Sequence, residues 1–256
     1  MSRLLRAAAV AAGAVLAAQA LPALTSVGPL RNRLTPGLAG VGEADHVALT
    51  FDDGPHPLST PHFLALLDRL DLKATFFLLG RWAARSPSLV KEIASAGHEL
   101  AVHGFDHRCL LARGVRGTYD DLARARDVIA AASGEQPAWF RPPYGVMTAA
   151  TVSAARRLGL RPVLWTAWGE DWTARATPET VSRTVLDDLG PGATILLHDS
   201  DVTSVPGSWR ATLGAVPRIV AACQERGLRP GPLAEHGLRP LGSGPTRSGS
   251  MIGGDT

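Results

Sequence analysis

The chain has 256 residues, 45% of them hydrophobic, which fits one globular domain with terminal extensions and is long enough for a full core. Its net charge of +3 comes from the N-terminus, because Arg3, Arg6, Arg31 and Arg33 all precede the first acidic residue, Glu43. Removing those four from the 26 Lys and Arg residues leaves 22 basic residues against 23 acidic ones. A basic groove for nucleic acid is therefore not expected.

The first 30 residues have the pattern of an export signal. Two arginines are followed by an uncharged stretch, residues 7–18, and by Ala18-Gln19-Ala20, a small-x-small sequence that signal peptidase accepts. The uncharged run continues to residue 30 and so reaches the length of a membrane span, which leaves an uncleaved anchor as the alternative. We predict an exported protein, secreted or tethered to the membrane, with its body outside the cytoplasm and a linker over residues 31–45.

From residue 46, short apolar runs alternate with amphipathic stretches. Helix starts are marked where proline follows Thr60, Ser86 and Thr177, and Gly97 closes the second of these helices. Strands are predicted at residues 47–51, 74–79, 99–102, 138–140, 162–165 and 193–197.

This alternation predicts an α/β fold, a parallel sheet covered by helices. Six or more repeats in about 210 residues favour a closed or nearly closed (β/α) barrel over an open doubly wound sheet. The barrel domain is predicted over residues 46–240. The Gly-, Pro- and Ser-rich end, residues 241–256, reads as a disordered tail.

Polar clusters follow five of these strands. In parallel α/β folds the strand ends share one rim, where catalytic groups gather. Taken singly, each cluster also fits a turn or a packed side chain, but five in succession on one rim favour a catalytic site. The clusters are Asp52-Asp53, His103 with His107, Arg141 with Tyr144, Asp171-Trp172 and His198-Asp199.

The spacing of His103 and His107 lets two imidazoles reach one ion, and a nearby carboxylate would complete a three-ligand site with open coordination positions. One member of the Asp52-Asp53 pair would then bind the metal while the other acts as a base. The remaining histidines belong to no such cluster and are predicted to be surface or core residues; they are His46, His56, His62, His98 and His236.

In this order, "TFDDG", "HGFDH", "RPPYG", "DW" and "LLHD" resemble the five motifs of the polysaccharide deacetylase family, carbohydrate esterase family 4. The resemblance covers about residues 46–230. The family includes chitin and peptidoglycan N-deacetylases and acetylxylan esterases. It implies a distorted (β/α) barrel and a divalent metal, commonly zinc or cobalt.

Carried over residue by residue, the resemblance implies that Asp53, His103 and His107 bind the metal. It implies that Asp52 is the catalytic base, held by Arg141, and that His198 is the general acid with Asp171 as its partner. The pocket would be formed by the backbone N–H of Tyr144, which stabilises the oxyanion, and by Trp165 and Leu196, which enclose the acetyl methyl group.

Two positions depart from the pattern of many relatives. Gly104 stands where a Ser or Thr is common, which removes a side-chain hydrogen bond near the metal ligands. Trp168 stands where an acidic residue is common, so support for His198 rests on Asp171 alone.

The function predicted is metal-dependent removal of acetyl groups, foremost N-acetyl, from an amino-sugar-containing glycan of the envelope or extracellular space. The alternatives are an O-acetyl esterase of the acetylxylan type and a non-catalytic glycan-binding envelope protein; an iron oxygenase ranks lowest. Indoles near the rim would stack on sugar rings, the candidates being Trp165, Trp168, Trp172 and Trp209. The glycan and the oligomeric state stay open, and Cys109 and Cys223 fit either one disulfide or two thiols.

Overall fold

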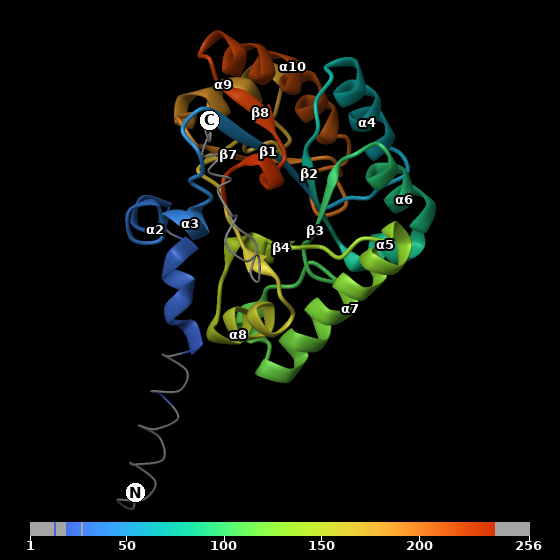
Figure 1. Cartoon of the computed structure of the whole chain (residues 1–256), viewed down its shortest axis with the longest axis vertical. Coiled ribbons are helices and arrows are strands. Elements are labelled where there is room, and N and C mark those ends of the chain that lie inside the picture. Colours follow the sequence, from blue (N-terminus) through green and yellow to red (C-terminus); the bar gives the residue numbers. More distant parts are fainter. Residues whose placement is uncertain (1–12, 14–18, 27, 239–256) are drawn as a thin grey trace, which may run out of the picture.

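The computed structural model describes residues 13, 19–26 and 28–238 (Figure 1). Eight strands form one sheet in the order β5-β4-β3-β2-β1-β7-β6, with β8 paired to β1, and every pair is parallel. The strands are β1 (His46–Asp52), β2 (Thr75–Leu78), β3 (Glu99–Val102), β4 (Trp139–Phe140), β5 (Arg161–Pro162), β6 (Ala167–Trp168), β7 (Thr194–His198) and β8 (Arg229–Gly231).

Helices surround the outside of this curled sheet, as Figure 1 shows, and the predicted distorted barrel of parallel strands is confirmed. The larger helices are α4 (Thr60–Arg69), α5 (Gly80–Arg85), α6 (Pro87–Ser95), α7 (Val115–Ser133), α8 (Ala149–Arg157), α9 (Pro178–Asp188) and α10 (Trp209–Glu225). The shorter ones are η1 (Leu21–Ser26), α2 (Gly28–Leu34), α3 (Pro36–Ala39), η2 (Leu110–Ala112), η3 (Pro143–Gly145) and η4 (Leu233–Glu235). Within the described part of the chain, no helix is long and apolar enough to cross a bilayer.

Local sequence explains several helix boundaries. Thr177 caps α9, since its side chain accepts from the Thr180 N–H while Pro178 occupies the first turn. Gly97, with φ of 80°, takes the left-handed conformation just after α6 ends. Helix α4 begins at Thr60 with Pro61 in its first turn, as predicted, and Ser59 stands at the N-cap position.

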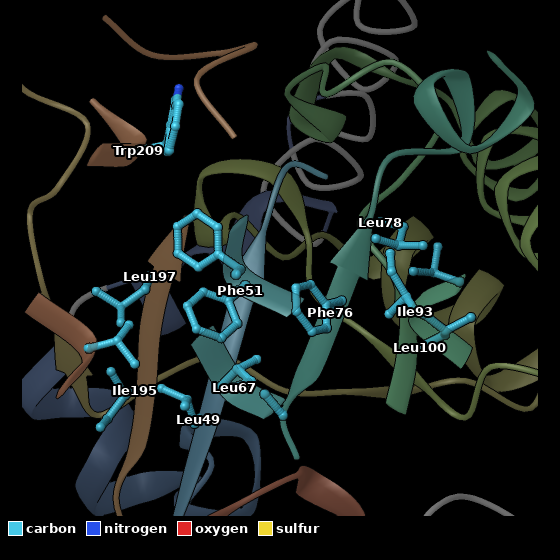
Figure 2. Packing of buried hydrophobic residues seen from close by; sticks show 14 of the residues in the cluster. Leu49, Phe51, Leu67, Phe76, Leu78, Ile93, Leu100, Ile195, Leu197 and Trp209 are labelled. Carbon is cyan, nitrogen blue, oxygen red and sulfur yellow. The ribbon is translucent and has the colours of Figure 1, made fainter. Parts of the chain in front are cut away.

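The β1 strand divides the core into two layers. Leu49 and Phe51 point into the layer between sheet and helices, where Phe51 stacks on Phe76 with ring centroids 5.2 Å apart (Figure 2). Ala48 belongs instead to the smaller cluster inside the barrel. Because side chains alternate along a strand, Asp52 follows Ala48 to the interior side. The alternation therefore delivers the last residue of β1 to the barrel mouth.

Three sequence expectations need correction or completion. The predicted linker, residues 31–45, contains the end of α2 and all of α3, and Ala39 is fully buried. The strand predicted over 162–165 ends at Pro162, and β6 and β8 were not predicted. Cys109 is an exposed free thiol and Cys223 a buried one. The predicted tail, residues 241–256, lies outside the described residues, as does most of the signal region before residue 19.

A buried histidine pair closes the end of the barrel opposite the rim. His46 Nδ1 lies 2.9 Å from His236 Nδ1, and His236 Nε2 lies 3.0 Å from the Gly40 carbonyl. Because a carbonyl only accepts, His236 carries its proton on Nε2, so its Nδ1 accepts from the His46 Nδ1–H. Both rings are thus neutral. Of the surface and core positions predicted for the histidines outside the motifs, these two therefore occupy the core.

Acidification is expected to weaken the fold through this pair. Burial, with the neighbouring His236 adding to it, lowers the pKa of His46 to about 4 from 6.5, so between those values the unfolded chain binds a proton that the folded chain does not. The free energy of unfolding should fall by roughly 3 kcal/mol across that window. Urea unfolding of wild type and of His46→Gln at several pH values measures this change in the free energy of unfolding. If that free energy depended on pH equally in both proteins, the prediction would be contradicted. The control is His62→Gln, because His62 is exposed and should keep the pH dependence of wild type.

Candidate active site

The strand ends bring the predicted polar clusters to one mouth of the barrel. Asp52 ends β1 and His198 ends β7, and the two are register partners across these neighbouring strands. His103 directly follows β3 and Arg141 directly follows β4. The order of strands in the sheet therefore places side chains from distant parts of the sequence around one cavity.

The adjacent aspartates both face this cavity. In a regular strand, neighbouring side chains point to opposite sides. Asp53 breaks the strand with φ of 78°, and both carboxylates line the same cavity. Asp52 is 2% exposed and Asp53 is fully buried, so each needs a charged or hydrogen-bonding partner.

Asp53, His103 and His107 form a group that could hold a metal ion, with their candidate ligand atoms within 4.8 Å of one another. Asp53 Oδ1 lies 3.5 Å from His103 Nε2 and 3.4 Å from His107 Nε2. This oxygen is buried and has no hydrogen-bond partner. A carboxylate and two imidazoles that converge on an otherwise unsatisfied point fit a divalent cation.

The tautomer of His103 is set by the backbone. Its Nδ1 lies 2.8 Å from the Arg141 carbonyl, so Nδ1–H donates and the Nε2 lone pair faces Asp53. Burial lowers the pKa of His103 to about 3, although Asp53 opposes this, and a neutral ring is what metal binding requires. The fixed ring orientation is the usual arrangement of a metal-binding histidine.

Asp52 is held by a buried ion pair. Arg141 Nη1 donates to Asp52 Oδ1 at 2.7 Å and to Thr50 Oγ1 at 2.8 Å. Burial raises the pKa of Asp52, and Arg141 opposes this rise, as a bound cation would also do. The free oxygen, Oδ2, is 3.7 Å from His103 Nε2. Asp52 therefore lies beside the possible metal site and keeps one oxygen available for a proton.

His198 and Asp171 form a second pair on the other side of the cavity. Asp171 Oδ1 is 2.8 Å from His198 Nδ1, and its Oδ2 accepts from the His198 backbone N–H at 2.8 Å and from Thr212 Oγ1 at 2.7 Å. Burial alone would lower the pKa of His198, but the Asp171 carboxylate outweighs it and raises that pKa to about 10. His198 can thus hold a proton throughout the neutral range, without a second acidic partner at Trp168.

The loop that carries the two histidines is held by Asp121 of α7. Asp121 Oδ2 accepts from the Phe105 N–H at 3.0 Å, and Oδ1 lies 2.9 Å from Arg113 Nη1. Gly104 has φ of 82°, and a Cβ there would lie 3.2 Å from the same Asp121 oxygen. A carboxylate from α7 therefore holds the loop beside Gly104.

The cavity has a volume of about 350 Å³, and several aromatic rings form part of its wall. Trp165, Trp168 and Trp172 all line it, with Trp168 and Trp172 stacked at 4.4 Å. Leu196 and Tyr144 lie in the wall, and the Tyr144 side chain is 63% exposed. The polar residues of this cavity suit a polar group of a ligand, and the indoles beside them suit the apolar faces of the larger molecule that carries it.

Some residues stand elsewhere than predicted, and others were missed. Trp209 is not at the rim. It is buried at the start of α10 and stacks on His62, and Figure 2 shows it beside the outer core.

Two threonines that contact the site were not predicted. The Thr203 hydroxyl donates to Asp53 Oδ2, and the Thr212 hydroxyl donates to Asp171. Both come from segments without a motif, so the sequence carried no signal for them.

This barrel mouth holds a possible metal site, a carboxylate held by an arginine and a histidine paired with a carboxylate, an arrangement that suits hydrolysis. A family model described as polysaccharide deacetylase matches residues 39–163. A chitooligosaccharide deacetylase from Azorhizobium caulinodans is 34% identical over 194 residues, covering 73% of this chain and 92% of that protein. The chain therefore belongs to the polysaccharide deacetylase family.

Comparison with solved structures leads to the same family. The family 4 carbohydrate esterase from Streptomyces lividans, in complex with acetate, is 36% identical and superposes with a TM-score of 0.66 over 73% of this chain and 92% of its own. BA3943 from Bacillus anthracis, a pseudoenzyme of the same family, is 28% identical with a TM-score of 0.68 over 75% of this chain and 65% of its own. The expected family and enzyme class are confirmed.

Proposed function

We propose that this protein removes N-acetyl groups from an N-acetylglucosamine-containing glycan, using a divalent metal held by Asp53, His103 and His107. The observation that carries the proposal is the placement of Asp52 with Arg141 and of His198 with Asp171 around that group in one cavity. Relatives named as chitooligosaccharide and peptidoglycan deacetylases support the glycan class. Since the fold also occurs in a pseudoenzyme, the proposal rests on the complete set of polar groups rather than on the barrel.

When bound, a divalent cation would polarise the acetyl carbonyl and lower the pKa of the attacking water. Asp52 takes the proton of that water, and Arg141 keeps the carboxylate aimed at it. The backbone N–H of Tyr144 donates to the developing oxyanion. Trp165 and Leu196 enclose the methyl group, which fits their place in the cavity wall.

His198 gives its proton to the departing nitrogen. An amine leaves poorly without a proton, so an acid held protonated by Asp171 suits amide hydrolysis. An alcohol leaving group depends less on such an acid. This feature favours N-acetyl over O-acetyl substrates. Zinc suits the one-carboxylate, two-imidazole set, and cobalt is the alternative.

We also propose that the protein acts outside the cytoplasm, on an envelope or extracellular glycan. The support is the N-terminal pattern, two arginines followed by an uncharged run and a small-x-small sequence. Fractionation of cells that express the full chain tests the location, and an N-terminal sequence of the recovered protein tells cleavage at residue 20 from an intact anchor.

Acetate release tests the activity. The full chain is stripped with a chelator, reloaded with zinc or cobalt, and offered N-acetylglucosamine oligomers, peptidoglycan and acetylxylan. Metal-dependent release from the first two, faster than from acetylxylan, is expected. Release from acetylxylan alone would make the protein an O-acetyl esterase. No release from protein that holds one metal ion would favour a glycan-binding role.

Asp171→Asn is expected to move the alkaline limit of activity to lower pH. With the Asp171 charge in place the imidazolium persists to about pH 10, and without it the pKa of His198 falls. The acid form is therefore lost at lower pH, and the descending limb of kcat should shift down by about one unit or more. The pH profile of acetate release measures this, with exposed Asp187→Asn as control. An unmoved alkaline limb would contradict the role of Asp171.

A further inference from the structure

The backbone between β5 and β6 is held by two arginine side chains. Three successive carbonyls, of residues 163, 164 and 165, accept from guanidinium groups. Arg141 bonds the first at 3.4 Å and the second at 2.9 Å, and Arg31 Nη2 bonds the third, that of Trp165. Arg141 is the partner of Asp52, but Arg31 belongs to α2, before the region that the family model matches.

Arg31 reaches the site from a segment that packs beside residues 163–165, between β5 and β6, the two end strands of the sheet. The Leu164 N–H donates to the Leu38 carbonyl at 2.7 Å, so the chain around α3 lies directly beside residues 163–165. Arg31 is only 4% exposed, and its other amino group donates to the Thr25 carbonyl at 3.2 Å. Arg31 and Leu38 are thus joined by hydrogen bonds to the backbone behind the cavity wall.

The guanidinium also lies over the indole of Trp165, with Cζ 5.2 Å from the ring centroid. One planar group can therefore bond the backbone of Trp165 and contact its ring, which a lysine ammonium cannot do in the same way. Among the described residues, no carboxylate lies within ion-pair distance of Arg31, and its Nε has no hydrogen-bond partner. A buried charge without a counter-ion costs stability, so a role beyond folding is indicated.

Trp165 has little freedom on its remaining sides. A Cβ at Gly145, which has φ of 67°, would lie 2.7 Å from the indole Cη2, and the Trp168 ring centroid is 5.7 Å away. Trp165 lines the cavity together with Leu196. A shift of this indole would change the width of the cavity at the point where the substrate's acyl group is expected.

We propose that Arg31 is a positioning residue that fixes Trp165 and so restricts the cavity to an acetyl-sized acyl group. This inference rests on the proposed function for its consequence, since selectivity among acyl groups presupposes deacetylation. The contact between Arg31 and Trp165 itself does not depend on that function. Arg31, which follows the predicted export signal, then supports the wall of the substrate site through Trp165.

The kinetic test uses full-length Arg31→Gln and Arg31→Lys, with Arg33→Gln as matched control because Arg33 is exposed on the same helix. Each protein is offered N-acetylglucosamine oligomers and the same oligomers carrying N-propionyl groups. The ratio of kcat/KM for acetyl over propionyl should fall about tenfold in both Arg31 variants, mainly through the propionyl kcat, and stay unchanged in the control. Wild-type ratios in folded Arg31 variants would overturn the proposal.

A second readout needs no catalysis. Acrylamide quenching of the Trp165 fluorescence is obtained by subtracting, for each variant, the same variant that also carries Trp165→Phe. We expect Trp165 to be about twofold more quenchable in Arg31→Gln than in wild type and unchanged in Arg33→Gln. Unchanged quenching in Arg31→Gln and Arg31→Lys that melt cooperatively would overturn the inference. If wild type releases no acetate, the proposed function fails while this measurement still decides whether Arg31 fixes Trp165.

Discussion

Asp52→Asn is expected to lower kcat for acetate release by about 10³-fold, because an amide cannot take a proton from water and a positioned general base contributes about 10²–10⁴-fold. KM should change little, since Asn keeps the size of the side chain and can still contact Arg141. Acetate release under saturating substrate, with the metal content of each sample measured, provides the test.

A loss of stability has to be separated from the loss of the base. Arg141 is fully buried, and the variant leaves it without its carboxylate, which costs about 3–5 kcal/mol for a buried pair. Rates are therefore compared well below the melting temperature of the variant. Asp45→Asn is the control at the opposite end of β1, where Asp45 is 61% exposed and pairs with Arg229 at 3.0 Å. A folded, metal-loaded Asp52→Asn protein within tenfold of wild type would exclude Asp52 as the base.

The rim could be predicted because its residues directly follow strands. Asp52, His103 and His198 each end or follow a strand that is bonded on both sides, and parallel strands carry their ends to one face. An apolar run of four to seven residues is readable as such a strand. Position in the sequence was then enough to place these side chains together.

The residues that support the rim from behind could not be predicted from the sequence in the same way. β5 and β6 have two residues each, too few to show a period, and the carbonyls of residues 163–165 accept from Arg141 and Arg31 rather than from a neighbouring strand. Arg31 lies in a stretch rich in Gly, Pro and Leu that resembles a linker by composition. Its burial depends on contacts more than a hundred residues away in the chain, which local patterns do not encode.

Side-chain partners from other helices were missed for the same reason. Asp121 lies within a charged stretch that reads as a solvated helix face, yet it is 7% exposed and accepts from the Phe105 N–H. Thr212 supports Asp171 from α10 across 41 positions of sequence. Each is a single polar residue on an amphipathic helix, and only the packing of that helix decides which side chains reach the site.

His103→Gln is expected to weaken divalent metal binding by about 100-fold or more and to bring acetate release to background. His103 is held by the Arg141 carbonyl at 2.8 Å so that Nε2 faces Asp53, and an amide offers neither the nitrogen ligand nor this orientation. The zinc affinity of the full chain, measured by competition with a chromophoric chelator, gives the effect on binding independently of turnover.

The control for that variant is His98→Gln, because His98, just before β3, is also buried and its Nδ1 accepts at 3.3 Å from the N–H of Ala74, just before β2. Loss of that hydrogen bond should destabilise the fold while zinc binding stays at the wild-type level. If His103→Gln bound zinc like His98→Gln, the ion would be held elsewhere and the arrangement of Asp53, His103 and His107 would need another explanation. If only His103→Gln lost the ion, metal binding would be assigned to the barrel rim, separately from the stability of the strands that form it.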